Sequence, residues 1–403
     1  MNFRSYEIKD ICKIKSGKRL PKGTDFSEKP TKHKYIRARD IKNGKIDGSD
    51  LGYISEEIHK KIARYIVNTN DIIITIAGTI GEVALVSKKF DGVNLTENAV
   101  RLTEFSKDVC PEFLAYILKS PERKEYMEQV AGGSAQPKLG IYKIEAIKVD
   151  LPDIQIQHKI ADILSAYDDL IENNQKQIKL LEEAAQRLYK EWFVDLRFPG
   201  HANTKIVDGV PEGWSKSTVS EVSAILRRGI SPKYNEKARG IVINQKCIRQ
   251  TIVSYDEART QEKKYPDELK MMESDILICS TGAGTLGRVG QVFEAKENVT
   301  LDSHVTLIRA NERVGQQYLF WSLKMQQDYL MSAGKGSTNQ LELSRETIGN
   351  CEILVPERKM AGQAEKNFAA IHDKMKECSM KITRLREARD LLLPKLMSGE
   401  MEV

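Results

Sequence analysis

One glycine-rich motif in the sequence has the spacing of a nucleotide-binding turn. Gly282-Ala283-Gly284-Thr285-Leu286-Gly287 is a GxGxxG pattern directly after the strand-like segment 275–279, and such a pattern can bind a dinucleotide or S-adenosylmethionine. That chemistry needs a helix to begin at the motif, so that its N-terminus faces a phosphate, whereas residues 288–293 alternate like a strand. We therefore predict a tight strand-to-strand turn. A nucleotide-dependent enzyme that uses the Gly282–Gly287 turn remains an alternative.

Other catalytic patterns are incomplete. Pro266-Asp267-Glu268-Leu269-Lys270 resembles the acid and lysine set of some nucleases, but those residues belong on separate strands and here fall in one polar segment. The sequence has no Walker A motif, no [DN]PP[YF] tetrapeptide, no HExxH and no CxxC among its six cysteines. We expect no catalytic residue, no metal site, no cofactor bound by this chain, and a reducing, cytoplasmic environment.

Two basic stretches give the positive functional signal. Residues 13–45 contain 12 Lys or Arg and 3 acids, and residues 227–249 contain 7 Lys or Arg and one acid, Glu236. A single charge run is usually a solvated surface, but its recurrence favours a surface that binds a polyanion such as DNA. Glycine turns can bring backbone close to DNA. The candidate DNA-binding residues are Lys13, Lys15, Lys18, Arg19, Lys22, Arg37, Arg39, Gly78, Thr79, Gln136, Arg227, Arg228, Lys233, Arg249, Thr285 and Gln340.

The chain of 403 residues contains an internal repeat with an offset near 204 residues. Residues 71–74 (DIII) match 275–278 (DILI), and the glycine turn 78–81 (GTIG) matches 284–287 (GTLG). In each copy, β-like runs bounded by turn residues precede a helical stretch. The repeat therefore predicts an α+β fold with two mixed α/β domains, each followed by a long helix.

The two long helices carry matching apolar stripes. Starting at 164 and at 368, steps of three and four residues give apolar side chains at eight of nine positions in each helix, the exceptions being Asn174 and Arg389. A stripe sustained over four heptads favours a coiled coil between the two helices over separate amphipathic helices. If a pseudo-two-fold axis relates the two copies, the helices should run antiparallel. Asp153 is expected to cap the first helix, and Pro394 to kink or end the second near Leu393. The predicted interface residues are Leu164, Ile171, Ile178, Leu181, Leu188, Phe368, Ile371, Met375, Ile382, Leu385 and Leu392.

Three further stretches carry a resemblance to a known family. Residues 191–201 (EWFVDLRFPGH) close the first helix, 210–214 (VPEGW) open the second copy, and 392–400 (LLPKLMSGE) lie near the end of the chain. Together with the duplicated layout, they resemble the specificity subunit of type I restriction-modification systems over essentially the full length.

The resemblance implies a domain plan and a set of partners. It places target-recognition domains at 1–152 and 214–356, a central helix at 153–198, a linker at 199–213 and a C-terminal helix at 357–403. Each domain would read one half of an asymmetric bipartite site in double-stranded DNA, and the coiled coil would set the gap. The implied partners are two modification (methyltransferase) subunits and restriction (translocase/nuclease) subunits. We expect no association with a membrane. S-adenosylmethionine, ATP and Mg²⁺ would bind to those partners, and this subunit would be non-catalytic. A coiled-coil scaffold without a DNA role is the remaining alternative.

Overall fold

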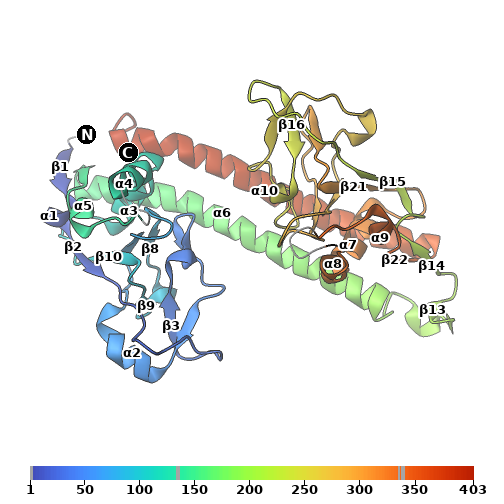
Figure 1. Cartoon of the computed structure of the whole chain (residues 1–403), viewed down its shortest axis with the longest axis horizontal. Coiled ribbons are helices and arrows are strands. Elements are labelled where there is room, and N and C mark those ends of the chain that lie inside the picture. Colours follow the sequence, from blue (N-terminus) through green and yellow to red (C-terminus); the bar gives the residue numbers. More distant parts are fainter. Residues whose placement is uncertain (1–2, 133–136, 335, 337–340) are drawn as a thin grey trace. The chain divides into compact units, whose positions relative to one another are not determined.

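The computed structural model describes residues 3–132, 137–334, 336 and 341–403. The chain divides into two units: the first unit contains residues 1–170 and 385–403, and the second unit contains residues 171–384. Each unit combines one globular part with segments of the two long helices, α6 (Ile154–Tyr189) and α10 (Arg358–Ser398) (Figure 1). Among the residues that the structure describes, none of the helices has the length and apolarity needed to cross a membrane.

The first unit contains a four-stranded antiparallel sheet in the order β2-β10-β7-β8 and a three-stranded mixed sheet in the order β6-β3-β9, in which β3 and β9 are parallel. A third pairing joins β1 to β11. The strands are β1 (Arg4–Glu7), β2 (Lys13–Ser16), β3 (His33–Ile36), β4 (Ile41–Lys42), β5 (Lys45–Ile46), β6 (Gly52–Ile54), β7 (Ile72–Thr75), β8 (Val83–Leu85), β9 (Asn94–Leu95), β10 (Ala99–Thr103) and β11 (Lys148–Leu151). The helices are α1 (Ile8–Ile11), α2 (Glu56–Ile62), α3 (Pro111–Lys119), α4 (Pro121–Ala131) and α5 (Ile141–Glu145).

The second unit repeats this topology. Its sheets have the orders β15-β21-β18-β19 and β17-β16-β20, and β14 pairs with β22. The strands are β12 (Ile206–Val207), β13 (Val210–Pro211), β14 (Ser215–Thr218), β15 (Ser223–Arg228), β16 (Gly240–Ile243), β17 (Arg259–Gln261), β18 (Ile276–Cys279), β19 (Val289–Gln291), β20 (Val299–Leu301), β21 (Val305–Ala310) and β22 (Glu352–Val355). The helices are α7 (Gln316–Met325), α8 (Gln327–Ser332) and α9 (Arg345–Gly349). The predicted repeat and the α+β class are confirmed.

The strand pattern explains why each unit has a core on both sides of its main sheet. Ile72 and Ile74 in β7 belong to one buried cluster and Ile73 to another, because successive side chains point to opposite faces. In β18, Ile276 and Ile278 likewise belong to one buried cluster and Leu277 to another. Both faces are therefore buried, which accounts for strands that are apolar at every position.

In each unit an ion pair joins the aspartate directly before one inner strand, β7 or β18, to an arginine in the other inner strand, β10 or β21. Arg101 in β10 donates to Asp71 at 3.0 Å, and Arg309 in β21 donates through Nε to Asp275 at 2.6 Å. Asp71 also accepts a bond from the Asn68 backbone N–H, which closes the turn before the strand. The aspartates of the repeated sequence motif therefore have a structural role in both units.

The glycine-rich motif joins two antiparallel strands. β18 pairs antiparallel with β19, and β7 pairs in the same way with β8. Gly282, Gly284 and Gly287 have φ values of 104°, 74° and 74°, a region that favours glycine. The predicted strand-to-strand turn is confirmed, and no helix begins at residues 282–291 to receive a pyrophosphate.

Helices α6 and α10 pack antiparallel within each unit. In the first unit, Asp168 bonds to Arg389 and Lys159 bonds to the Val403 carbonyl, so residue numbers fall along the C-terminal segment as they rise along α6. In the second unit, Gln177 contacts Cys378, and the Tyr189 ring farther along α6 packs against Phe368, ten residues earlier in α10, so the direction is the same. The predicted antiparallel pairing is confirmed.

Every position of the predicted apolar stripes is buried or half-buried. Asp153 accepts a bond from the Gln155 N–H at 3.1 Å and precedes α6, as expected of its N-cap. Helix α6 passes into a π-helical turn, Lys190–Val194, so helical conformation ends before residue 198. Of the two outcomes predicted for Pro394, a kink or an end of the helix near Leu393, the end is wrong, because α10 continues to Ser398. Leu392, Leu393, Leu396 and Met397 on both sides of the proline pack in the core of the first unit, which favours continuation despite the lost backbone bond.

Candidate nucleic-acid interface

Four loops meet at one end of the sheets in the first unit. The Gly17 N–H donates to the Ala99 carbonyl at 3.1 Å, the Thr96 N–H to Ile36 at 3.0 Å, and the Ile76 N–H to Asn98 at 2.8 Å. These bonds join the segments that follow β2, β3, β7 and β9. We call residues 17–22, 37–40, 76–81 and 96–98 the first loop cluster.

The second unit forms the same arrangement. The Gly229 N–H donates to Val305 at 3.1 Å, the Asp302 N–H to Ile243 at 2.9 Å, and the Ser280 N–H to His304 at 2.8 Å. Residues 229–233, 244–249, 280–287 and 302–304 form the second loop cluster. Because the backbone bonds correspond one to one, the two clusters offer equivalent frameworks for different side chains.

A glycine is required where the first loop of each cluster begins. A Cβ at Gly17 would lie 2.0 Å from the Thr96 carbonyl oxygen, and one at Gly229 would lie 2.1 Å from that of Leu301. Real Cβ atoms do not approach backbone this closely. The glycines therefore allow the loops that carry Lys18, Arg19 and Lys233 to lie directly against the loops after β9 and β20.

The repeated glycine turns belong to these clusters. Gly78 and Gly284 have φ values of 82° and 74°, and a Cβ on either would meet nothing within 4 Å. Thr79 is exposed, whereas the Thr285 hydroxyl donates to the Thr281 carbonyl at 3.1 Å. The candidates Gln136 and Gln340 lie outside the described residues.

The basic side chains of the first unit fall into two groups. Lys13 and Lys15 in β2 both bond to Glu104, and the bonds from these two lysines lower the Glu104 pKa to about 2. Lys13 at the first position of β2 pairs with Thr103, next to Glu104, whereas the first loop cluster begins after the last position of β2, Ser16. The structure therefore separates Lys13 from the loop residues Lys18, Arg19 and Lys22, which are exposed in the cluster.

Arg37 and Arg39 have different environments although they are two residues apart. Arg37 is only 18% exposed and donates through Nε and Nη2 to Asp40, each at 2.9 Å. It also donates to the Asp50 backbone carbonyl. Arg39 is 67% exposed and has a longer contact of 3.4 Å with the Asp50 carboxylate. Arg37 thus stabilises the turn at Ala38–Asp40, while Arg39 is presented on that turn to solvent.

Each candidate cation of the second unit has an acidic partner. Arg227 pairs with Glu268 and Lys233 with Glu262. Arg228 uses both Nη groups, bonding to Glu342 at 2.5 Å and to the Leu343 carbonyl at 2.7 Å. Arg249, 62% exposed, contacts Glu257 at 3.4 Å. A phosphate group can replace the exposed pairs of Arg227, Lys233 and Arg249 at small cost, since such pairs contribute only about 0–1 kcal/mol. Arg228 is only 24% exposed and is held by two protein acceptors.

Sequence reasoning missed the loops after β9 and β20. Glu97, His304 and Asn98 carry no basic signal, yet residues 96–98 and 302–304 lie at the centre of the clusters. His304 Nδ1 bonds to the Thr281 hydroxyl at 2.6 Å. Lys246 occupies the exposed position in the second loop cluster that corresponds to Arg39 in the first. It lies within the second basic stretch, so its charge could have identified it as a candidate DNA-binding residue.

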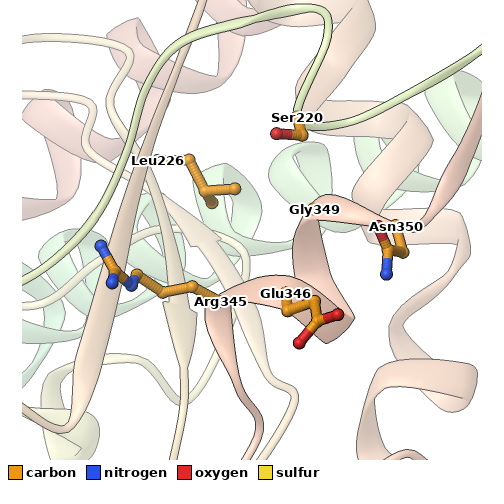
Figure 2. A pocket seen from close by; sticks show the side chains of 6 residues that line it. All are labelled: Ser220, Leu226, Arg345, Glu346, Gly349 and Asn350. Carbon is orange, nitrogen blue, oxygen red and sulfur yellow. The ribbon is translucent and has the colours of Figure 1, made fainter.

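The hollow in Figure 2 is separate from the loop clusters. It is lined by Ser220, Leu226, Arg345, Glu346, Gly349 and Asn350. Within the described ranges, no group of three or more His, Cys, Asp or Glu side chains is placed to hold a metal ion. All six cysteines are buried free thiols, and burial raises the pKa of Cys279 to about 12, which makes it unreactive.

A comparison with protein families matches this chain to the type I restriction modification DNA specificity domain at residues 2–183 and 211–373. The MjaIX specificity subunit of Methanocaldococcus jannaschii is 25% identical over 366 residues, which cover 87% of this chain and 82% of that protein. The HindI specificity subunit of Haemophilus influenzae is 24% identical over 475 residues, which cover 99% of this chain and 100% of the other.

A solved structure has the same fold. The S subunit of the type I restriction-modification system from M. genitalium superposes with a TM-score of 0.61 and 18% identity, covering 98% of this chain and 96% of that one. The family match spans both repeats, and the structure shows the two α+β units and the paired long helices α6 and α10. This chain therefore belongs to the family of type I restriction-modification specificity subunits, the DNA-recognising and non-catalytic components of those systems.

Proposed function

We propose that the two recognition domains, residues 1–152 and 214–356, each read one half of an asymmetric bipartite DNA site. The observation that carries this proposal is the pair of loop clusters, which share a backbone framework and differ in side chains. Arg39 corresponds to Lys246, Arg19 to Ser231 and Glu97 to Ser303. Equivalent loops with different hydrogen-bonding groups dock in equivalent ways and recognise different bases.

The exposed cations supply affinity and the loops supply selectivity. Lys18, Lys22, Lys233 and the paired lysines 13 and 15 are suited to phosphate contacts, which fix the position of a domain on the duplex. Exposed loop arginines are suited to base edges in the major groove. The central helix (153–198) and the C-terminal helix (357–403) set the gap between the half-sites, and residues 199–213 link the two copies.

The chemistry of the system resides in partner subunits. We propose that two modification subunits supply S-adenosylmethionine-dependent methylation and that restriction subunits supply ATP- and Mg²⁺-dependent translocation and cleavage. The present chain contributes target selection to that complex.

Equilibrium DNA binding by the assembled complex across a salt series tests the proposal. The logarithm of the binding constant should fall linearly with the logarithm of salt concentration, with a slope of about −0.9 for each phosphate contacted. The charge-reversal variant Arg39→Glu should weaken binding, whereas Lys61→Glu on α2, outside the loop cluster, is the matched control. Salt-independent binding, or equal binding by a complex that lacks this chain, would indicate a scaffold without a DNA role.

A further inference from the structure

Arg19 is held differently from the other arginines of the loop clusters. Its side chain is 79% exposed, and its Nε donates to Glu97 Oε1 at 2.7 Å. Among the described residues, no acceptor is bonded to its Nη1 or Nη2. The guanidinium group is therefore fixed through one donor while the far edge, with two parallel N–H groups, is open to solvent.

The backbone on both sides of this contact is fixed as well. The Lys18 N–H donates to the Leu95 carbonyl at 2.8 Å, and the Tyr35 hydroxyl donates to the Lys18 carbonyl at 2.7 Å. The Thr96 hydroxyl donates to the second oxygen of Glu97 at 3.1 Å. Burial alone would raise the Glu97 pKa, but the bonds from Arg19, from its own backbone N–H and from Thr96 leave it lowered, so the carboxylate is charged at neutral pH.

This combination is absent from Arg37, Arg39 and Arg249 in the clusters and from Arg228, which directly precedes the second cluster. Arg37 and Arg228 use their Nη groups on protein acceptors and are 18% and 24% exposed. Arg39 is exposed, but its 3.4 Å contact is made through Nη2, the edge that a base would need. Arg249 likewise contacts Glu257 through Nη2. Arg19 alone among these five combines high exposure, a fixed Nε and two open Nη groups.

We propose that Arg19 is the guanine-reading residue of the first recognition domain and that Glu97 is its positioning residue. Guanine presents O6 and N7 side by side in the major groove, and two parallel arginine N–H donors match them. Because Glu97 already restrains the side chain, less conformational entropy is lost when the base is bound. The second unit has Ser231 and Ser303 at the corresponding positions, so this contact belongs to one half-site only. The inference rests on the proposed function.

The test compares methylated motifs made by the complete complex in a host that lacks other adenine methylation. The variants are Arg19→Ala, Glu97→Ala and Glu97→Gln, with Glu57→Ala as the matched control, because Glu57 pairs with Lys61 on α2 at 2.6 Å. Arg19→Ala should relax one guanine in one half-site to any base, with discrimination lost by about 10- to 100-fold. Glu97→Ala should relax the same base partially, and Glu97→Gln, which keeps an acceptor for Nε, should restore most of the discrimination.

If a variant complex no longer methylates DNA, its base preference can be measured by competition binding with duplexes that differ at the one base pair. Wild-type complex should lose about 10- to 100-fold affinity when that one base pair is changed, and the Arg19→Ala complex should bind all four duplexes equally. An unchanged motif in Arg19→Ala, with a salt slope smaller by about one, would show a phosphate contact and overturn the inference. A wild-type complex that yields no bipartite motif would instead overturn the proposed function itself.

Discussion

Asp168 in α6 and Arg389 in α10 form a charged contact at the helix seam of the first unit. Arg389 Nη1 donates to Asp168 Oδ1 at 2.6 Å, and the Tyr116 hydroxyl donates to the other carboxylate oxygen at 2.8 Å. The two charged side chains are 27% and 21% exposed. Arg389 is the polar exception in the second apolar stripe, and its partner explains how a charge is accommodated there.

Breaking this contact should destabilise the first unit. Asp168→Ala leaves the partly buried Arg389 with only its exposed neighbour Asp390, and Arg389→Ala leaves the Asp168 carboxylate with only the Tyr116 hydroxyl. We expect each variant to lose about 1–3 kcal/mol in the free energy of unfolding. The double variant should lose less than the sum, which urea denaturation and a double-mutant cycle measure. The exposed Glu57–Lys61 pair is the control and should couple by no more than about 0.5 kcal/mol. Additive losses at Asp168 and Arg389 would contradict the contact.

The close-packed glycines should be intolerant of any side chain. Gly17→Ala and Gly229→Ala place a Cβ about 2 Å from a carbonyl oxygen, so each should lower the melting temperature or prevent folding of its own unit. Gly362→Ala in α10 meets nothing within 4 Å and should stabilise by up to about 1 kcal/mol, because alanine favours a helix. Thermal unfolding of the three variants provides the comparison. Wild-type stability in Gly17→Ala would show that the loops are not packed as described.

His372 should make the second unit less stable at mildly acidic pH. Gln291 Nε2 donates to the Ser274 carbonyl, so its Oε1 accepts and His372 Nδ1 donates across 3.0 Å. Nε2 of His372 is buried without a partner. Burial lowers the His372 pKa from 6.5, and the nearby Lys376 charge acts in the same direction, whereas the Asp373 and Glu273 charges act to raise it.

The sign of the effect follows from the lowered pKa. Below about pH 6.5 the unfolded chain binds a proton at this histidine that the folded chain does not bind, so stability is full above that pH and falls as the pH decreases. Urea unfolding between pH 7.5 and 5.5 should show this loss, and His372→Gln, which can still donate to Gln291, should reduce it. An identical pH dependence in the variant would assign the effect to other groups.

Shortening both helices by one heptad should shorten the gap in the DNA site. Deleting 172–178 and 378–384 removes facing segments and keeps the stripe in phase, because each deletion is seven residues long. The helices lose about 10 Å, equivalent to roughly three base pairs. Methylome sequencing should return the same half-sites with the shorter gap. Deleting only 172–178 should abolish methylation through loss of register, whereas an unchanged gap in the double deletion would contradict the role of the helices.

The fold was largely predictable because its signals are periodic. Offsets near 204 residues identified the duplication, and heptad spacing identified the seam, including Phe368 and Ile382, which are both buried. Local chemistry also predicted the turn at Gly284. The continuation of α10 through Pro394 was not predictable from local preference, since it depends on Leu393 and Leu396 packing on a core that is distant in sequence.

The candidate interface was only partly predictable. Charge located the segments that contain Arg19 and Arg39, but charge did not distinguish them from Arg37, whose donors are taken up by Asp40. That difference depends on tertiary contacts. Glu97 was missed because an acidic residue carries no signal for DNA binding until strand register places it beside Arg19.

Selection of an asymmetric bipartite DNA target by this chain can be tested in cells. Single-molecule methylome sequencing with and without its gene is the decisive measurement. We predict that deletion of the gene removes adenine methylation from one motif, made of two different half-sites separated by a fixed gap of unspecified bases. A palindromic or continuous motif, or a methylome that is unchanged by the deletion, would show that this chain does not select such a target.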